Sequence, residues 1–341
     1  MISPQGPWFA LSTLAVCHLA VLLAGFIAPY RFEEQNRLLT FAPPTRIHFI
    51  DAQRKFHLRP FVYRQTLRPG SFAEYEENRD VAYPLYFFTS GPEYTLLGLF
   101  HSRRHLFGME QPAHLFLIGS DAYGRDVFSR LLYGGRISLF AGLLAALISV
   151  SLGSMLGSAA GYYGGWTDGI LMRLTEIFLA MPWLYLLLAV RALLPLHIPP
   201  QQAFFLLIGV VGTVGWARPA RLVRGVALSA KEREYVLTAR SFGASDFYLL
   251  RTHILPFVSG VALTQTLLYI PQFILLEVTL SFFGLGVSEP VPSWGNMLSD
   301  WQHFLLSDFY WWLLAPAVVL TAVLLAYYRL FDFIKANNLL F

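Results

Sequence analysis

Charged residues are scarce in this sequence: Asp, Glu, Lys and Arg make up 13% of its 341 residues, against about a quarter in soluble domains. This deficit excludes an ordinary soluble domain, because a water-exposed surface needs charged side chains. Hydrophobic residues instead reach 55%, the mean hydropathy is +0.50, and several long runs carry no charge. The composition therefore predicts an integral membrane protein.

Cysteine is nearly absent, because Cys17 is the only one, and this excludes an intrachain disulfide and a cysteine-rich metal site. The residues before Cys17 faintly resemble a lipoprotein cleavage site. However, Val16 precedes the cysteine, no basic residue lies upstream, and the hydrophobic run continues beyond it. These features favour an uncleaved first membrane span.

Lysine is also rare, and none of the three lysines (Lys55, Lys231 and Lys335) follows a glycine. The phosphate-binding loop Gly-x-x-x-x-Gly-Lys-Ser/Thr is therefore absent, and no Ser/His/Asp or Cys/His arrangement stands out. The net charge of +4 comes from dispersed arginines without a nucleic-acid-binding motif. We expect a chain that is not an enzyme, holds no cofactor of its own and binds no nucleic acid.

Six apolar segments are about long enough to cross a bilayer, which predicts an all-α membrane fold of six helices: 8–30, 137–167, 174–194, 201–217, 257–287 and 311–328. Pro182 predicts a kink in the third segment. Gly153, Gly157 and Gly161 recur every four residues, so we expect one smooth helix face for close packing.

Residues 31–115 are too polar to cross a membrane and too many for a simple turn. Segments 45–50 and 55–63 alternate apolar with polar residues, which is the period of a β-strand. Aromatic runs at 83–88 and 94–100 indicate further strands. The chain thus divides into a first helix (1–30), a largely β extracytoplasmic insertion (31–115) and a helical membrane domain with five further spans (116–341).

His101 and His105 within this insertion have a spacing that a helix would bring together, as in some zinc sites. No acidic or cysteine third ligand lies nearby, and two arginines separate the histidines. We therefore expect no metal site.

The short loops set the orientation. Residues 218–251 contain seven basic side chains and the turn at 195–200 has none, which places 218–251 and the C-terminus in the cytoplasm. Six spans then put the N-terminus in the cytoplasm too, and 31–115 outside.

The stretch 231–256 is the most charged run in the second half of the chain. Its spacing predicts a short amphipathic helix that ends at Gly243, with Tyr235, Thr238, Ala239 and Phe242 on one face. Ser245 or Asp246 could cap a second short helix that leads towards Pro256. Two small helices at a bend suit docking in a groove of another protein.

This stretch resembles the cytoplasmic coupling loop of bacterial ABC-importer permeases, most closely the dipeptide/oligopeptide permease family. The residues that carry the resemblance are Glu234, Tyr235, Ala239, Arg240, Gly243, Ala244, Leu255 and Pro256. Leu237, Thr238 and His253 depart from the general pattern of such loops. The alternative is an ordinary polar loop between membrane helices.

A second resemblance to the same family lies in residues 119–136, before the second span, and is carried by Asp121, Gly124, Arg125, Asp126 and Arg130. The dense alternation of Asp and Arg favours an ion-paired, ordered lip at the membrane surface. An acid/base pair of Asp121 and Asp126 is the less favoured alternative. Residues 288–310, rich in proline and tryptophan, resemble another family segment and predict an interfacial or re-entrant element.

The resemblance covers about 116–317 and, by position, the first span. It implies a homologous second permease subunit and two cytoplasmic ATPases that bind ATP and Mg. It also implies an extracytoplasmic binding protein that delivers peptides or similar solutes across the bacterial inner membrane.

Two other classes stay open. A secondary transporter or channel driven by an ion gradient would place several ionisable residues in mid-membrane, where only Glu176 and Glu277 qualify. A membrane-anchored sensor would not need six spans. Glu277 is a candidate for the translocation path, with a structural hydrogen bond as the equal alternative.

Overall fold

The computed structural model describes residues 7–71, 74–96, 100–182, 185–186, 189, 199–302 and 310–337. Two compact units make up the chain. Unit 1 comprises Met1–Ser12, Phe140–Glu277 and Val323–Phe341, and unit 2 comprises Thr13–Leu139 and Val278–Ala322.

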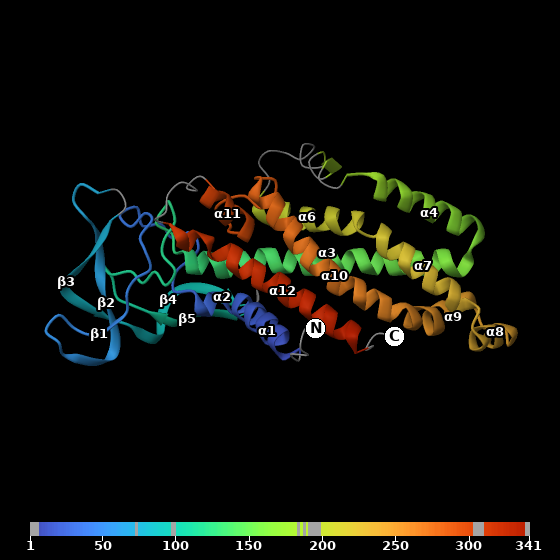
Figure 1. Ribbon diagram of the computed structural model, residues 1–341, viewed down its shortest axis with the longest axis horizontal. Helices are drawn as coiled ribbons and strands as arrows, with labels where there is room; N and C mark the ends of the chain where they lie inside the picture. Colours follow the sequence, from blue (N-terminus) through green and yellow to red (C-terminus); the bar gives the residue numbers. More distant parts are fainter. Residues whose placement is uncertain are drawn as a thin grey trace. The chain divides into compact units, whose positions relative to one another are not determined.

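Along the sequence, two helices precede a β region and the remaining helices follow it, as the labels in Figure 1 show. The long helices are α3 (Val127–Tyr163), α4 (Gly165–Ala180), α6 (Pro200–Val214), α7 (Ala217–Lys231), α10 (Leu255–Phe282) and α12 (Ala315–Ala336). The other described helices are α1 (Trp8–Leu22), α2 (Ala24–Ile27), α8 (Glu234–Ser241), α9 (Asp246–Leu249) and α11 (Trp294–Gln302), with a π-helical η1 (Leu250–Ile254) and a 3₁₀ η2 (Trp311–Leu314).

Among the residues that the structure describes, four helical segments are long and apolar enough to cross a membrane: Val127–Tyr163, Phe204–Lys231, Asp246–Phe282 and Trp311–Ala336. They contain most of the predicted second, fourth, fifth and sixth spans. The chain is therefore a multi-pass membrane protein, and the total of six spans stays a prediction.

The predicted first span is not one continuous helix. Its α1 has 15 residues, and α2 follows after an interruption at Leu23. The cause lies in unit 2, where Arg136 donates to the Leu22 carbonyl at 3.1 Å, while the Phe26 amide donates to Leu23 instead. An α-helix would use the Leu22 carbonyl for the Phe26 amide.

The predicted third span is only partly described. Its α4 ends at Ala180, and Met181 is extended (ψ 129°) because it precedes Pro182, which disfavours a helical residue before it. Pro182 therefore follows the end of α4 instead of kinking it. Most of 183–198 lies outside the described residues.

The insertion in unit 2 is largely β, as predicted. Strands β1 (His48–Ile50), β2 (Phe56–Leu67) and β3 (Tyr75–Pro84) form one antiparallel sheet, and β4 (Tyr86–Leu96) pairs with β5 (Phe100–Gly108) in another. A small apolar cluster closes around Val62, Leu85, Ala113 and Leu115, all at most 5% exposed. The first two strands occupy the two segments in which the sequence alternates.

His101 and His105 lie on strand β5, so the helix that would pair them does not form. The His105 ring contacts the carbonyl oxygens of Ala28 and Pro92, each at 2.8 Å. Among the described residues, no group of three or more His, Cys, Asp or Glu side chains could hold a metal ion.

In unit 1 the predicted glycine face of α3 is confirmed. A Cβ atom at Gly153 would lie 2.7 Å from Pro219, and one at Gly161 would lie 2.8 Å from Ala227, both on α7. Gly157 meets the backbone of the same helix at Ala220. The absence of side chains at these three positions lets α3 and α7 pack in close contact.

Candidate functional site

The loop that the sequence singled out begins with α8. This helix ends in a Schellman turn, in which the Gly243 amide donates to Arg240 at 3.0 Å and the Ala244 amide donates to Ala239 at 3.1 Å. Gly243 has a φ of +85°, and a Cβ atom there would meet nothing within 4 Å. Glycine is therefore required for backbone conformation and not for space.

Helix α9 starts at the predicted cap, because the Ser245 hydroxyl accepts a hydrogen bond from the Tyr248 amide at 3.3 Å. The predicted second short helix is therefore present, but it does not stop before Pro256: α9 continues through η1 into α10 as one segment, Asp246–Phe282. Pro256 explains the π-turn between them. It has no amide hydrogen, and the Leu255 amide donates five residues back to Leu250.

A buried cluster anchors both short helices to the long ones. Val236 of α8, Leu249 of α9 and Ile254 of η1 are at most 2% exposed and pack with α7 side chains such as Val223. Each fully buried side chain of this size contributes roughly 2 kcal/mol. Ala239 and Ala244 pack against the same cluster, so the bend cannot move without disturbing the ends of the spans.

The predicted common face of α8 is partly wrong. Ala239 packs inwards with Val236, whereas Tyr235, Thr238 and Phe242 are exposed. The buried face of α8 contains Val236 and Ala239, which are three residues apart. A helix of only two turns is too short for the sequence pattern to show which of its faces is buried.

Polar contacts hold the bend as well. The Tyr162 hydroxyl, near the end of α3, donates to Asp246 at 2.6 Å and accepts from Arg240 at 2.9 Å. The Arg240 guanidinium lies 5.3 Å from the centre of the Tyr162 ring. Arg240 and Asp246 also lie within 3.7 Å of each other. Tyr162 was absent from the sequence prediction, because nothing in its neighbourhood indicates a partner 84 residues away.

Helices α8 and α9 follow the end of α7 (Figure 1). Large apolar side chains remain exposed on both short helices. We call this set the coupling surface: Tyr235, Leu237, Phe242, Phe247 and Tyr248, with exposures from 45% to 87%. Exposed apolar rings on a charged, otherwise polar loop indicate contact with another protein. Glu234 lies in the first turn of α8 and Leu255 opens α10, both exposed.

The second predicted motif forms an ion-paired cluster in unit 2. Arg125 bonds Asp121 at 2.6 Å, and Arg130 lies 3.6 Å from the same carboxylate. Both arginines are at most 3% exposed. Gly124 allows the turn, since its φ is +71° and a Cβ atom would collide with the Asn36 backbone.

Two acidic residues of this cluster were missed by sequence reasoning. Glu289 bonds Arg125 at 2.6 Å and Arg130 at 2.7 Å, and Asp300 lies 3.6 Å from Arg125. Burial, followed by the nearby Glu289 carboxylate, raises the pKa of Asp300 to about 6. The two residues lie in the proline- and tryptophan-rich segment, whose family resemblance was the only signal of its importance.

Asp126 does not join the ion pairs. It caps α3 by accepting from the amide and the hydroxyl of Ser129, at 2.8 and 2.6 Å. Burial raises the pKa of Asp126 to about 7 in spite of these hydrogen bonds. Because Asp121 faces arginines and Asp126 faces Ser129, this geometry favours a structural lip over an acid/base pair.

Glu277 is 2% exposed on α10, deep in a span-length segment. Burial agrees with both sequence alternatives, since a charged group in a span faces protein or a watery path.

The profile of a known family matches residues 153–337, just over half of the chain; it is described as "Binding-protein-dependent transport system inner membrane component". The match includes α7 to α10 and therefore the whole coupling surface.

Curated relatives agree with this match. The chain is 39% identical over 214 residues to the dipeptide transport system permease protein DppC of Bacillus subtilis, covering 63% of this chain and 65% of the relative. It is 38% identical over 191 residues to the glutathione transport system permease protein GsiD of Pectobacterium atrosepticum, covering 56% and 62%.

A third relative, the oligopeptide transport system permease protein OppC of Escherichia coli K12, is 37% identical over 218 residues, covering 64% of this chain and 69% of the relative. The chain thus matches less than two thirds of the length of the Bacillus and Pectobacterium proteins. From these matches together we conclude that the chain belongs to the family of inner membrane components of binding-protein-dependent transport systems.

Proposed function

We propose that the chain is a permease subunit of an ATP-driven ABC importer that carries peptides or similar small solutes across the bacterial inner membrane. The observation that carries the proposal is the coupling surface. It presents exposed aromatic rings on two short helices whose inner side packs on the ends of the long ones. If a groove in a partner protein closed around these two short helices, it would move them together with the attached long helices as a rigid body.

The partners in this proposal are two cytoplasmic ATPases, which bind ATP and Mg themselves, and a homologous second permease. Docking would involve Glu234, Tyr235, Arg240 and the turn at Gly243. The Schellman turn and the Tyr162 contacts support this docking, because a pair of short helices that is already held in one conformation loses less entropy on binding.

An extracytoplasmic solute-binding protein is the fourth partner. We place the β region of unit 2 outside the membrane and 218–251 with both termini in the cytoplasm, following the positive charge of the short loops. Several strand residues of the β region are apolar yet exposed, among them Phe56 (64%) and Leu58 (89%). An apolar surface on a polar domain favours a protein contact, and the binding protein is the partner that reaches this side.

The test is purification of the tagged chain from its native membranes in mild detergent. Stoichiometric recovery of a second permease and two ABC ATPases, with solute uptake that stops when ATP hydrolysis is inhibited by vanadate, is the expected result. A chain purified without ATPases, with uptake that follows a proton or sodium gradient and ignores vanadate, would assign it to the secondary transporters instead.

A further inference from the structure

Unit 1 contains a cavity of about 260 Å³ between α4, the junction of α6 with α7, and α10. Its walls are mainly apolar and aromatic, and three polar side chains also line it: Arg218, Tyr269 and Gln272. A few polar groups in an otherwise apolar cavity are typical of small-molecule binding sites.

The walls of the cavity are firmly packed. A Cβ atom at Gly215 would lie 2.8 Å from the ring of Phe273, so the end of α6 packs directly against this side chain of α10. The rings of Phe273 and Tyr269 lie 5.0 Å apart, and Phe178 of α4 meets Trp216 edge-on at 5.7 Å. The site is therefore formed before any ligand arrives.

Three arginines of α7 differ in their partners. Arg224 is paired with Asp168, and hydrogen bonds from Arg224 lower the pKa of that carboxyl group. Arg221 contacts Glu176 at 3.3 Å. In the part of the chain that the structure describes, Arg218 alone of the three has no acidic partner.

An arginine without a counter-charge is costly in this position. Arg218 lies in the span-length segment Phe204–Lys231, at the border between its apolar first part and the basic part that we place on the cytoplasmic side, and a guanidinium at this border avoids lipid in favour of water, protein or an anion. It is exposed in the isolated chain and lines the cavity together with the exposed Gln272. The cavity therefore opens towards water or an anionic ligand.

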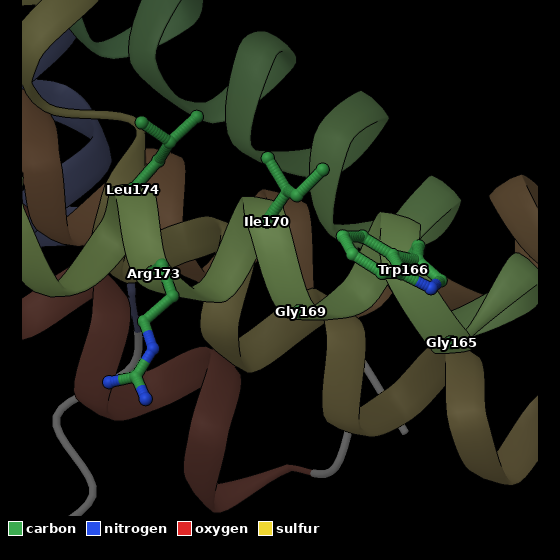
Figure 2. A pocket seen from close by; sticks show the side chains of 6 residues that line it. All are labelled: Gly165, Trp166, Gly169, Ile170, Arg173 and Leu174. Atoms are coloured by element: carbon green, nitrogen blue, oxygen red, sulfur yellow. The ribbon is translucent and has the colours of Figure 1, made fainter.

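A larger groove of about 690 Å³ on α4 does not share these properties. Figure 2 shows Trp166, Ile170 and Leu174 in a row along this one helix, with Arg173 extending to another side. Arg173 is already paired with Glu176 at 2.9 Å, so the groove offers no free charge to a ligand.

We propose that the cavity at Arg218 is a binding site on the translocation path for a carboxylate group of the transported solute. The proposal rests on the importer function proposed above. The planar guanidinium of Arg218 can hold a carboxylate through two parallel hydrogen bonds, and the Gln272 amide and Tyr269 hydroxyl lie in the same lining to donate further ones. The apolar walls accept the rest of a small peptide.

The test uses the assembled transporter in proteoliposomes, with Cys17→Ser and a reporter cysteine, Leu179→Cys, in the cavity wall. Two methanethiosulfonate reagents of similar size, one anionic (sulfonatoethyl) and one cationic (trimethylammonioethyl), measure the local charge. We expect the anionic reagent to react at least tenfold faster relative to its rate with a free thiol. This preference should vanish in Arg218→Gln, persist in Arg218→Lys and be unchanged in the control Arg173→Gln.

The ligand class is tested by protection of the same cysteine. Tri-alanine, which has a free terminal carboxylate, should slow the labelling of this cysteine, and tri-alanine amide should not. Ala-Glu-Ala amide should also slow the labelling if Arg218 binds a side-chain carboxylate as well as a terminal one. Protection should be lost in Arg218→Gln. Equal rates for both reagents, no labelling at all, or equal protection by tri-alanine and its amide would overturn the site.

Uptake of radiolabelled tri-alanine by the same proteoliposomes separates the two proposals. If ATP-driven uptake is normal but labelling shows no charge preference, the site is wrong and the importer function stands. If no ATP-driven uptake of any solute occurs, the importer function fails, whatever the labelling shows.

Discussion

Tyr162 and Asp246, 84 residues apart in the sequence, share a hydrogen bond of 2.6 Å that ties the end of α3 to the start of α9. Arg240 of α8 donates to the same tyrosine hydroxyl. One side chain of a long helix thus contacts both short helices of the coupling surface. In the proposed importer, this contact would link a docked partner directly to a membrane span.

Replacing Tyr162 by Phe should uncouple the transporter without unfolding it. The buried ring stays, and its two hydrogen-bond partners, Arg240 and Asp246, are more than half exposed and can bind water instead, so we expect the free energy of unfolding to fall by about 1 kcal/mol or less. Stimulation of ATP hydrolysis by loaded binding protein should fall by up to about fivefold if that free energy contributes to coupling. Tyr163→Phe, at the exposed neighbouring residue, is the control and should leave both quantities unchanged. A Tyr162→Phe transporter with full stimulation would argue against this route.

Glu289→Gln should destabilise unit 2. Arg125 and Arg130 are almost fully buried and both depend on this carboxylate. Breaking a fully buried ion pair costs about 3–5 kcal/mol, and because Glu289 is partly exposed we expect about 2 kcal/mol. Thermal unfolding of the detergent-solubilised complex measures the effect. The matched control is Glu74→Gln, whose pair with Arg68 is exposed on both sides and should contribute little. Equal unfolding temperatures for the two variants would contradict a stabilising role of the ion-paired cluster around Arg125 and Arg130.

Asp126→Asn should change how stability depends on pH. The pKa of Asp126 is raised to about 7 by burial, so the folded chain binds a proton more tightly than the unfolded chain. The stabilisation from this proton is complete below the pKa of the unfolded state, near 4, and is lost as pH rises through about 7.

Asparagine keeps the cap on α3 and removes the charge. The variant should therefore gain stability relative to the parent between pH 5 and pH 7.5, with no further gain at higher pH. Melting temperatures over this range decide the matter, with the exposed Asp80→Asn as control. A constant difference between variant and parent at all pH values would mean that Asp126 does not titrate there.

The proposed orientation predicts opposite labelling of two serines. In a Cys17→Ser background, a cysteine at Ser71 in the β region should react with an impermeant maleimide added outside intact cells. A cysteine at Ser241, exposed at the end of α8, should react only after the cells are opened. The reverse pattern would invert the topology.

The sequence predicted the local features of the coupling region well, because they depend on neighbours in the chain. Gly243 ends α8 because glycine readily adopts a positive φ, and Ser245 caps α9 by accepting a hydrogen bond from the amide of Tyr248, three residues later. The glycine face of α3 was likewise readable from a four-residue period.

What sequence reasoning missed depends on distant residues. Glu289 joins Arg125 from 164 positions away, and no pattern in either segment indicates the other. Arg136 interrupts the first span by taking the Leu22 carbonyl, although hydropathy favours one continuous helix there. The sequence alone does not distinguish Arg218 from Arg221 and Arg224, because the acidic partners of the latter two lie on α4, more than 40 positions away.

The most direct test of the account is stimulated ATP hydrolysis in the Gly243→Val transporter. Valine at a φ of +85° costs about 1–2 kcal/mol and should distort the bend between α8 and α9, with no collision to disturb the membrane core. Gly225→Ala is the matched control, since it also has open space around its Cβ position but lies within the regular α7. We predict that Gly243→Val assembles with the second permease yet loses ATPase attachment or the stimulation by loaded binding protein, while Gly225→Ala keeps both. Full ATPase retention and full stimulation in Gly243→Val would contradict the assignment of the coupling surface.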